Sequence, residues 1–111
     1  MKIFVGYGYN ERDKWVEDLV FTLMRAFDAE PISGKEIPGQ KLDEGIKELI
    51  RKSDAVMGFV TRRGDKGAGG FYSTSRWVTD ELSIANAMNV SFVEVREDGV
   101  DPRTGLALAG S

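Results

Sequence analysis

The residues best placed to do chemistry in this sequence are a tryptophan and a glutamate four positions apart, Trp77 and Glu81. They lie in the stretch "STSRWVTDEL", where small hydroxyl residues precede a helical pattern. Side chains four apart on a helix are surface neighbours, so a large apolar group would stand beside one carboxylate. Such a pair can form a site that holds the carboxylate against a ligand, with Glu81 as the catalytic residue.

The angular position of Glu81 on this helix supports a functional role. The core-facing direction of the helix is set by apolar side chains three and four apart: Val78, Leu82 and Ala85. Glu81 lies roughly 60° from that direction, where a carboxylate is partly withdrawn from water and still open to a ligand. The alternative is a glutamate at the rim, paired with one of three arginines, Arg62, Arg63 or Arg76. On spacing alone this pairing is the more common arrangement.

Two missing residue types narrow the possible reactions. The sequence contains neither histidine nor cysteine, which excludes a Ser-His-Asp triad, a thiol nucleophile and metal sites built from imidazole or thiolate. Acid–base work must therefore fall to carboxylates, lysine, tyrosine or the backbone. A single glutamate held in a pocket becomes the leading candidate, and no metal site is expected.

The composition describes one ordinary globular domain. The chain has 111 residues, of which 41% are hydrophobic and 30% charged. Its net charge of −3 argues against a general nucleic-acid binder, which normally carries a basic excess. No apolar run approaches the ~20 residues of a membrane span, and the N-terminus lacks the layout of a secretory signal. We therefore expect a cytoplasmic protein without membrane or nucleic-acid partners.

Strand and helix patterns alternate along the chain. Runs of apolar, β-forming residues predict strands over 2–7, 29–33, 54–61 and 90–95. Amphipathic patterns predict helices over 11–27, capped by Asn10, and over 42–52 and 75–88. In the first helix one broad apolar stripe is expected to face the core: Trp15, Val16, Leu19, Val20, Leu23 and Phe27.

This alternation predicts the fold class. Strands joined through helices form right-handed βαβ crossovers and hence a parallel sheet with helices on both faces. We expect a flavodoxin-like three-layer α/β fold with four strands in the order 2-1-3-4. Such a sheet usually continues with a fifth strand and a covering helix, which the sequence does not show. Either the chain is truncated or the fold is completed in another way.

Three segments should converge on one cleft, because ligands of open parallel sheets bind at the carboxyl ends of the strands. They are "GYGYN", "SGKEIPG" and the long loop "TRRGDKGAGGFYSTS". The first lacks the third glycine of a dinucleotide fingerprint, so we reject that motif. A phosphate-accepting receiver domain is also rejected, because Asp54 begins its strand instead of ending it.

Several residues of these segments allow two interpretations. Tyr7 and Tyr9 could stack on a base, or divide between core and rim. Arg62 and Arg63 could hold a pyrophosphate, or simply be solvated. Ser75 is most simply the N-cap of the helix that carries Glu81.

Taken together, these segments resemble the Toll/interleukin-1 receptor (TIR) domain, in particular bacterial TIR-like effector domains. "KIFVGYG" is similar to the first strand and its loop, and "YSTSRWVTDELSIA" is similar to the W-x-x-x-E region. "GKEIPGQKLDEGIKELIRKSDAVMGFVT" is similar to the BB loop, the second helix and the following strand. The resemblance covers residues 2–96 and implies a TIR-like domain over 1–96 with a C-terminal tail over 97–111.

The resemblance also implies a function. Catalytic TIR domains cleave the nicotinamide–ribose bond of NAD⁺, here as the effector domain of a bacterial antiphage defence protein activated by oligomerisation. NAD⁺ would be the substrate, with no separate cofactor and with Glu81 as the catalytic residue. The implied substrate-binding residues are Tyr7, Gly8, Tyr9, Lys35, Gly39, Leu42, Thr61, Arg62 and Trp77. The implied partners are a second copy, through the BB loop at Gly34–Gly39, and a fused or associated cyclic-nucleotide sensor domain.

The expected mechanism needs only one carboxylate. Nicotinamide leaves as a neutral group, and a carboxylate can stabilise the oxocarbenium-like ribosyl centre electrostatically. Two other functions stay open. One is a non-catalytic TIR module for self-association and signalling. The other is an enzyme similar to nucleoside deoxyribosyltransferases, which are flavodoxin-like with a glutamate nucleophile. That family normally needs further aspartates in the sugar pocket, and the sequence does not place them.

Overall fold

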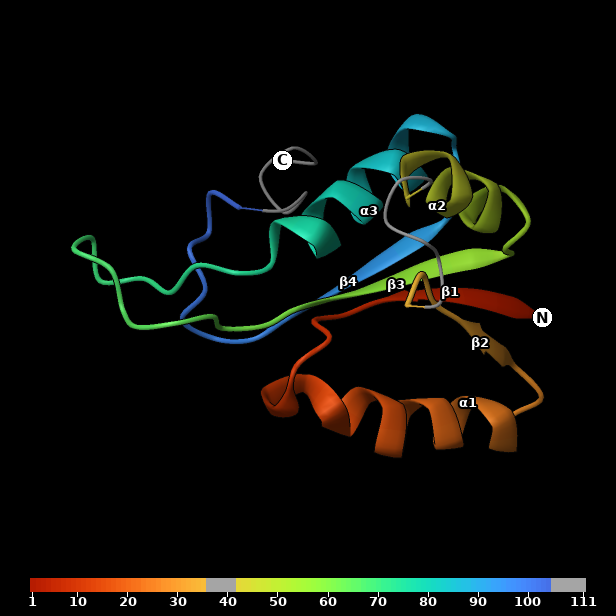
Figure 1. Ribbon diagram of the computed structural model, residues 1–111, viewed down its shortest axis with the longest axis horizontal. Coiled ribbons are helices and arrows are strands. Elements are labelled where there is room, and N and C mark those ends of the chain that lie inside the picture. The colour runs from red at the N-terminus through yellow and green to blue at the C-terminus, as the bar shows by residue number, and fades with distance from the viewer. Residues whose placement is uncertain (36–41, 105–111) are drawn as a thin grey trace.

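The centre of the protein is a parallel four-stranded sheet, seen in a computed structural model that describes residues 1–35 and 42–104 (Figure 1). The strand order is β2-β1-β3-β4. The strands are β1 (Lys2–Gly6), β2 (Glu30–Ile32), β3 (Ala55–Val60) and β4 (Phe92–Arg96). Phe4 in β1 pairs with Ile32 on one side and Val56 on the other. The predicted flavodoxin-like α/β fold and its strand order are confirmed.

Helices cover the two faces of the sheet unequally. Helices α2 (Leu42–Arg51) and α3 (Arg76–Ala87) pack side by side on one face (Figure 1). The other face carries a single helical segment made of a 3₁₀ turn, η1 (Glu11–Asp13), a wider π-helical stretch, η2 (Val16–Val20), and α1 (Phe21–Ala26). Asn10 caps this segment as predicted, its side chain accepting a bond from the Asp13 N–H at 3.0 Å. In the described part of the chain no helix could span a membrane.

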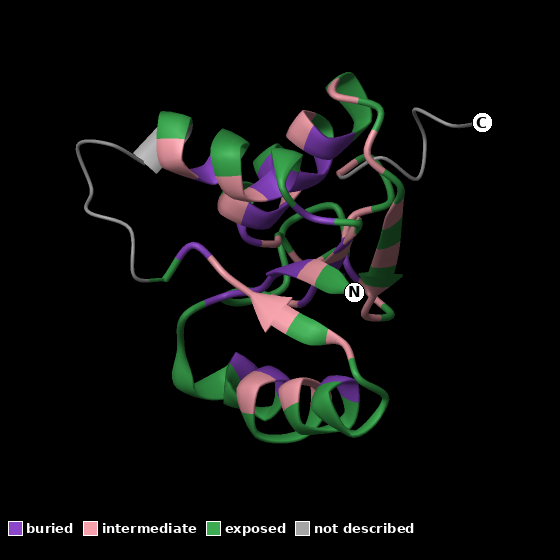
Figure 2. Cartoon of the chain, turned by 90° about the vertical axis from the view of Figure 1, so that its right-hand side faces the viewer, coloured by how far each residue is buried: buried purple, intermediate pink, exposed green. Residues whose placement is uncertain are grey.

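Two hydrophobic cores lie on either side of the sheet. Successive residues of a strand point to opposite faces, so β1 sends Phe4 into the core under α2 and α3 and Val5 into the core above α1. The first core also includes Val100, so the segment after β4 packs onto the same domain. In Figure 2 the buried residues gather where the sheet meets its helices, while much of α1 is exposed.

The close approach of α3 to the sheet depends on Gly58 in β3. A methyl group at this position would lie 2.7–2.8 Å from three side-chain carbons of Leu82. Leu82 is itself completely buried, so it has no free space into which it could move. The absence of a side chain at Gly58 therefore sets the distance between helix and sheet.

The helix over 11–27 does not bury its whole apolar stripe, and that prediction is wrong. Its sheet-facing side chains are Val16, Val20 and Met24. The other members of the stripe are exposed: Trp15, Leu19, Leu23 and Phe27. Trp15 packs edge to face against Phe59 of β3, and no described element covers the four side chains.

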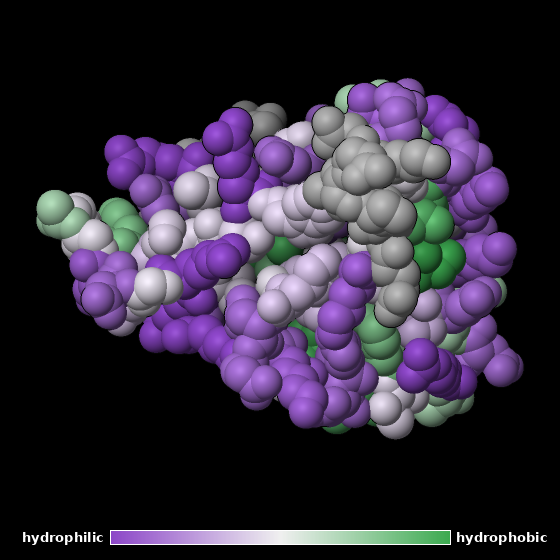
Figure 3. Space-filling model, viewed as in Figure 1, coloured by the Kyte–Doolittle hydropathy of each residue, from purple (hydrophilic) through white to green (hydrophobic). Residues whose placement is uncertain are grey.

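The long loop between β3 and α3 forms an arm that is tied to the C-terminal segment. Arg63 bridges to Ser73 across the base of the arm, and Tyr72 bridges to Val100. The arm extends away from the sheet in Figure 1. Figure 3 shows mainly hydrophilic side chains on this face of the molecule, with a few hydrophobic atoms at the far end of the arm.

Replacing Gly58 by alanine should destabilise the protein. The new methyl group must displace Leu82 within a filled core, which costs about 1–3 kcal/mol of unfolding free energy. Urea titration followed by circular dichroism measures this loss. Gly69→Ala is the matched control, because a methyl group there meets nothing within 4 Å. Equal stabilities of the two variants would contradict the close packing of α3 on β3.

Candidate functional site

Glu81 lies in the middle of α3 with its carboxylate against the carboxyl end of β1. Only 2% of the residue is exposed. A methyl group built on Gly6 would lie 2.6 Å from Glu81 Oε1, so the carboxylate occupies the space that a side chain at Gly6 would need. The angular analysis placed Glu81 on the shoulder of the apolar face, and the structure places it deeper than that.

The carboxylate of Glu81 has no partner among the described residues. Neither of its oxygens accepts a hydrogen bond from this part of the chain, and no arginine pairs with it. Burial raises the pKa of Glu81 to about 9, and the nearby charge of Asp80 adds to this rise. The indole N–H of Trp77 opposes the rise, but it approaches the carboxylate without completing a hydrogen bond. Glu81 is therefore protonated at neutral pH in the free protein.

Aromatic side chains surround this acid. Trp77, one helical turn before Glu81, is half-buried, and its ring lies 6.5 Å from that of Tyr9 in an edge-on arrangement. Burial raises the pKa of Tyr9 to about 12, with a further contribution from the charge of Glu81. Tyr9 therefore keeps its proton at neutral pH and can act as a hydrogen-bond donor.

Two cavities lie near this group. A small one of about 50 Å³ is lined by Ile46, Trp77, Asp80, Glu81 and Ile84. A larger one of about 410 Å³ opens on the other side of Tyr9, between the loops that follow β1 and β2, with Lys14 and Lys35 in its wall. Tyr9 lines the larger cavity and contacts the aromatic wall of Glu81, so it stands between the two spaces.

Tyr7 and Lys35 belong to one hydrogen-bonded chain centred on Glu17. The Tyr7 hydroxyl donates to Glu17 Oε2 at 2.7 Å, and Lys35 Nζ donates to the same oxygen at 2.9 Å. Both donors lower the pKa of Glu17, with Lys35 the larger influence. Tyr7 itself is buried on the α1 side of the sheet, where burial and Glu17 raise its pKa. Its ring still touches Tyr9, with centroids 4.9 Å apart.

Thr61 and Arg62 are held by other groups at the end of β3. Thr61 donates to Asp13 at 2.9 Å on the α1 side of the sheet, away from Glu81. Arg62 donates from Nε to the Asp98 carbonyl at 2.6 Å and lies over the ring of Tyr72. The contact of Thr61 anchors the end of β3, and the contacts of Arg62 anchor the start of the arm.

The other predicted site residues make few contacts in the structure or lie outside the described residues. Gly8 is buried beside the Asp13 carboxylate. Gly39 and the Leu42 side chain, like most of the expected BB loop, lie outside the described residues. The binding roles assigned to all these residues stay predictions. Ser75 does occupy the N-cap position of α3, but its side chain makes no capping hydrogen bond.

Asp13 is a buried acid that the sequence analysis missed. It is 3% exposed, its Oδ2 accepts from Thr61, and its Oδ1 has no partner within the described residues. No local pattern marks it, because an aspartate in the first turn of a helix is normally a solvated group that interacts with the helix dipole. In residues 1–35 and 42–104 no three acidic side chains come close enough to hold a metal ion.

The fold is similar to that of a 2-desoxiribosyltransferase from Leishmania mexicana, an enzyme that transfers a glycosyl group. The two structures align with a TM-score of 0.69 and 16% sequence identity over 87% of this chain. The chain spans 65% of the length of that protein. Neither a protein-family model nor a curated protein matches the sequence.

The resemblance to TIR domains is therefore corrected. The structural similarity is to a desoxiribosyltransferase, and no TIR family model matches. The quoted motifs are short, and their features are shared by the two folds for a physical reason. Ligands of open parallel sheets bind at the carboxyl ends of the strands, so glycine-rich turns at those ends occur in more than one family. The NAD⁺-cleaving antiphage role and the TIR signalling alternative lose their basis with the family.

Replacing Glu81 by glutamine should stabilise the protein above about pH 5. Below the unfolded-state pKa of 4.5 the acid is neutral in both states. As pH rises further, the unfolded chain ionises while folded Glu81 stays protonated up to about pH 9, so the wild type loses stability. Glutamine does not ionise, so the variant keeps its stability, whereas the unfolding free energy of the wild type falls by about 3 kcal/mol at pH 7.

Urea titrations of both proteins at pH 4 and pH 7 test this prediction. Any pH-independent offset from the amide cancels in the comparison between the two pH values. A stability difference that stays constant, or that favours the wild type as pH rises, would show that Glu81 is ionised in the folded protein.

Proposed function

We propose that this protein is an enzyme that cleaves or exchanges the N-glycosidic bond of a nucleoside, with Glu81 acting on the anomeric carbon. The observation that carries the proposal is the buried carboxyl group of Glu81 at the carboxyl end of β1, which has no partner among the described residues. A structural glutamate would be exposed or paired, because an unpaired buried carboxyl lowers the stability of the fold. Perturbed acids of this kind are typical of active sites.

The fold supports the same class of reaction. The similar desoxiribosyltransferase transfers a glycosyl group, and this chain has an acid able to form the bond that such a transfer requires. Among the described residues, Asp80 is the one aspartate that shares the cavity of Glu81, so the several further aspartates expected in a sugar pocket are not found there. A sugar pocket with fewer aspartates would favour a different substrate from that of an enzyme whose pocket has several.

The proposed reaction is a double displacement. A Glu81 carboxylate oxygen forms a bond to C1′ of the sugar while the bond from C1′ to the base nitrogen breaks, and the base takes the electron pair. A second base then attacks C1′ through a ring nitrogen and releases Glu81. The proton lost by the incoming base balances the proton gained by the departing one. When water replaces the second base, the result is hydrolysis.

Ionisation of Glu81 is the step that couples binding to reaction. The free protein holds the acid neutral, and a neutral acid is a poor nucleophile. Sugar hydroxyl groups that donate hydrogen bonds to the carboxylate favour its ionised form, and so does positive charge that develops at C1′. The indole ring of Trp77 excludes bulk water from this exchange.

Access to Glu81 requires movement of the aromatic wall. The space of about 50 Å³ beside the acid is too small for a sugar, whereas the adjoining cavity of about 410 Å³ can hold a nucleoside. Tyr9 separates them and is partly exposed. A rotation of the Tyr9 side chain would join the two spaces and bring a bound nucleoside to the acid.

The pH dependence of the reaction should follow Glu81. Because kcat/KM reports ionisations of the free enzyme, its value should rise about tenfold per pH unit from pH 6 and level off near pH 9. Initial rates at low substrate concentration give this profile. An acidic optimum would instead assign to Glu81 the role of a proton donor and contradict the nucleophilic role.

Chromatography of reaction mixtures tests the activity itself. The protein is incubated with a purine deoxynucleoside alone, with the same nucleoside plus a second free base, or with NAD⁺. Exchange of bases supports transfer, release without exchange supports hydrolysis, and nicotinamide release identifies NAD⁺ as a substrate. Absence of product from all substrates would overturn the proposal.

Glu81→Gln should lower the rate of the active reaction at least about 1,000-fold. Glu44→Gln is the matched control, since Glu44 is an exposed acid of α2. Circular dichroism confirms that both variants are folded. A Glu81→Gln variant that keeps the wild-type rate would remove Glu81 from the mechanism.

A further inference from the structure

Among the described residues, nothing covers one half of the sheet on the α1 side. The parallel sheet of an α/β protein is normally covered on both faces, and α2 and α3 cover the opposite face here. On the α1 side, β4 presents Val93 and Val95, of which Val93 is 56% exposed. Apolar side chains of a sheet that point outward into water indicate that a covering element is missing.

The helix beside this bare region carries a matching exposed stripe. Four large apolar side chains follow at intervals of four residues in this helical segment and at its end: Trp15, Leu19, Leu23 and Phe27. The first of them, Trp15, packs against Phe59 of β3. Leu19 is 54% and Phe27 is 83% exposed. Residues four apart form one continuous ridge on a helix. The molecule therefore has an apolar ridge running next to an apolar groove, whose floor is formed by β3 and β4.

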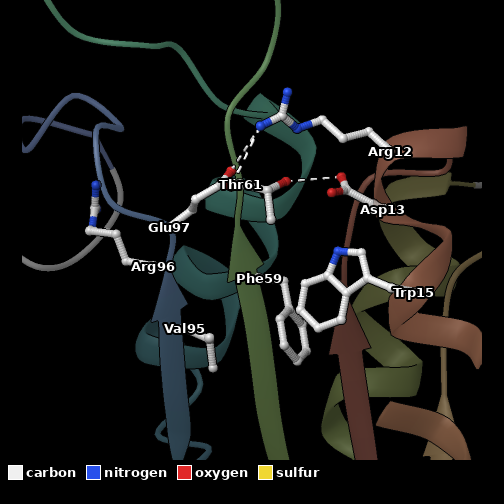
Figure 4. Close-up of a pocket in the computed structure, with 8 residues that line it drawn as sticks. All are labelled: Arg12, Asp13, Trp15, Phe59, Thr61, Val95, Arg96 and Glu97. Carbon is white, nitrogen blue, oxygen red and sulfur yellow. Dashed lines mark hydrogen bonds and ion pairs between the residues drawn. The ribbon is translucent and has the colours of Figure 1, made fainter. Parts of the chain in front are cut away.

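Figure 4 shows the end of this groove nearest the carboxyl ends of the strands. Trp15 from the helical segment, Phe59 from β3 and Val95 from β4 line one open space, with a cavity volume of about 440 Å³. The rings of Trp15 and Phe59 meet edge to face at 5.5 Å. Above them the lining is polar and comprises Asp13, Thr61, Arg96 and an exposed ion pair between Arg12 and Glu97, 3.4 Å long. An apolar centre with a charged rim is typical of protein interfaces.

The size of the surface fits a dimer of small contact area. The exposed parts of the ridge and of the two valines amount to roughly 600 Å², the upper end of the largest apolar patch on a typical monomer. Two such surfaces pressed together would bury about 1,200 Å², the lower limit for a specific and stable interface.

We propose that the occupant of the groove is the helical ridge of a second copy of this chain. In the described part of the molecule, the exposed large apolar side chains that lie on helices all belong to this ridge. A twofold axis parallel to the groove places the ridge of each copy in the groove of the other, because ridge and groove lie next to each other on one face. The pairing is isologous and closes at two copies.

The proposed interface is separate from the Glu81 site. Glu81 lies on the α3 side of the sheet and the groove on the α1 side, so the dimer can form whether or not the protein is an enzyme. It also differs from the self-association predicted through Gly34–Gly39, which stays a prediction.

Light scattering coupled to size-exclusion chromatography tests the dimer. At 100 µM the wild type should have about twice the mass of one 12.3 kDa chain, and its melting temperature should rise with concentration. Leu19→Lys on the ridge and Val93→Glu in the groove should each give a folded monomer, since each places one charge in the apolar contact. Asp18→Lys beside the ridge and Asn86→Glu on the opposite side of the sheet are matched controls at exposed positions and should stay dimeric.

A mixture of the two monomeric variants makes the test specific. In a mixed dimer, the introduced lysine of one copy meets the introduced glutamate of the other, while the second contact keeps its original residues. The mixture should therefore recover a dimer that neither variant forms alone. A monomeric wild type, or a dimer that survives Leu19→Lys, would overturn the proposal and leave the groove to another helix.

Discussion

The distance between α3 and the sheet is the constraint on which the rest of the structure depends. It is set by two glycines on neighbouring strands, Gly58 under Leu82 and Gly6 under Glu81. The first contact lets the helix come close enough to bury Leu82, and this closeness also removes the preceding side chain, Glu81, from water. The burial of Glu81 is thus a consequence of packing, and its unusual protonation is a consequence of burial.

This arrangement explains why the candidate site lies on regular elements. A carboxyl group on a flexible loop would turn toward water and recover its normal pKa. Glu81 is held by a helix whose core-facing residues Val78, Leu82 and Ala85 are fully buried, so it cannot turn away without disturbing the core. An acid without a partner among the described residues lowers the stability of the fold, and acids of this kind are more common in active sites than elsewhere.

Much of the fold could be predicted because its signals are periodic. The alternation of apolar strands and amphipathic helices defined the sheet and its order, and the helical angle singled out Glu81. The exposed ridge could not be predicted in this way, since periodicity shows that Trp15 and Leu19 share a side but not what covers that side. Asp13 was missed because its burial depends on a contact with Thr61, which lies 48 residues away in the sequence.

The family assignment failed for a related reason. A tryptophan four residues before a glutamate, and glycines after a strand, describe the requirements of a ligand cleft at the edge of a parallel sheet. Proteins with different reactions meet the same requirements, so such motifs do not distinguish one family from another. The comparison in three dimensions uses the arrangement of all elements at once, and it found a similar fold in a 2-desoxiribosyltransferase.

The arm between β3 and α3 has an evolutionary consequence. Its base is fastened by the bridge from Arg63 to Ser73, and its second half by the bridge from Tyr72 to Val100. Because these two bridges hold the base of the arm, an insertion or deletion within residues 64–70 would change the arm without moving the start of α3. Descendants of this protein can therefore change the length and chemistry of the arm rapidly, while the glycine contacts beneath α3 can change only together with the side chains above them.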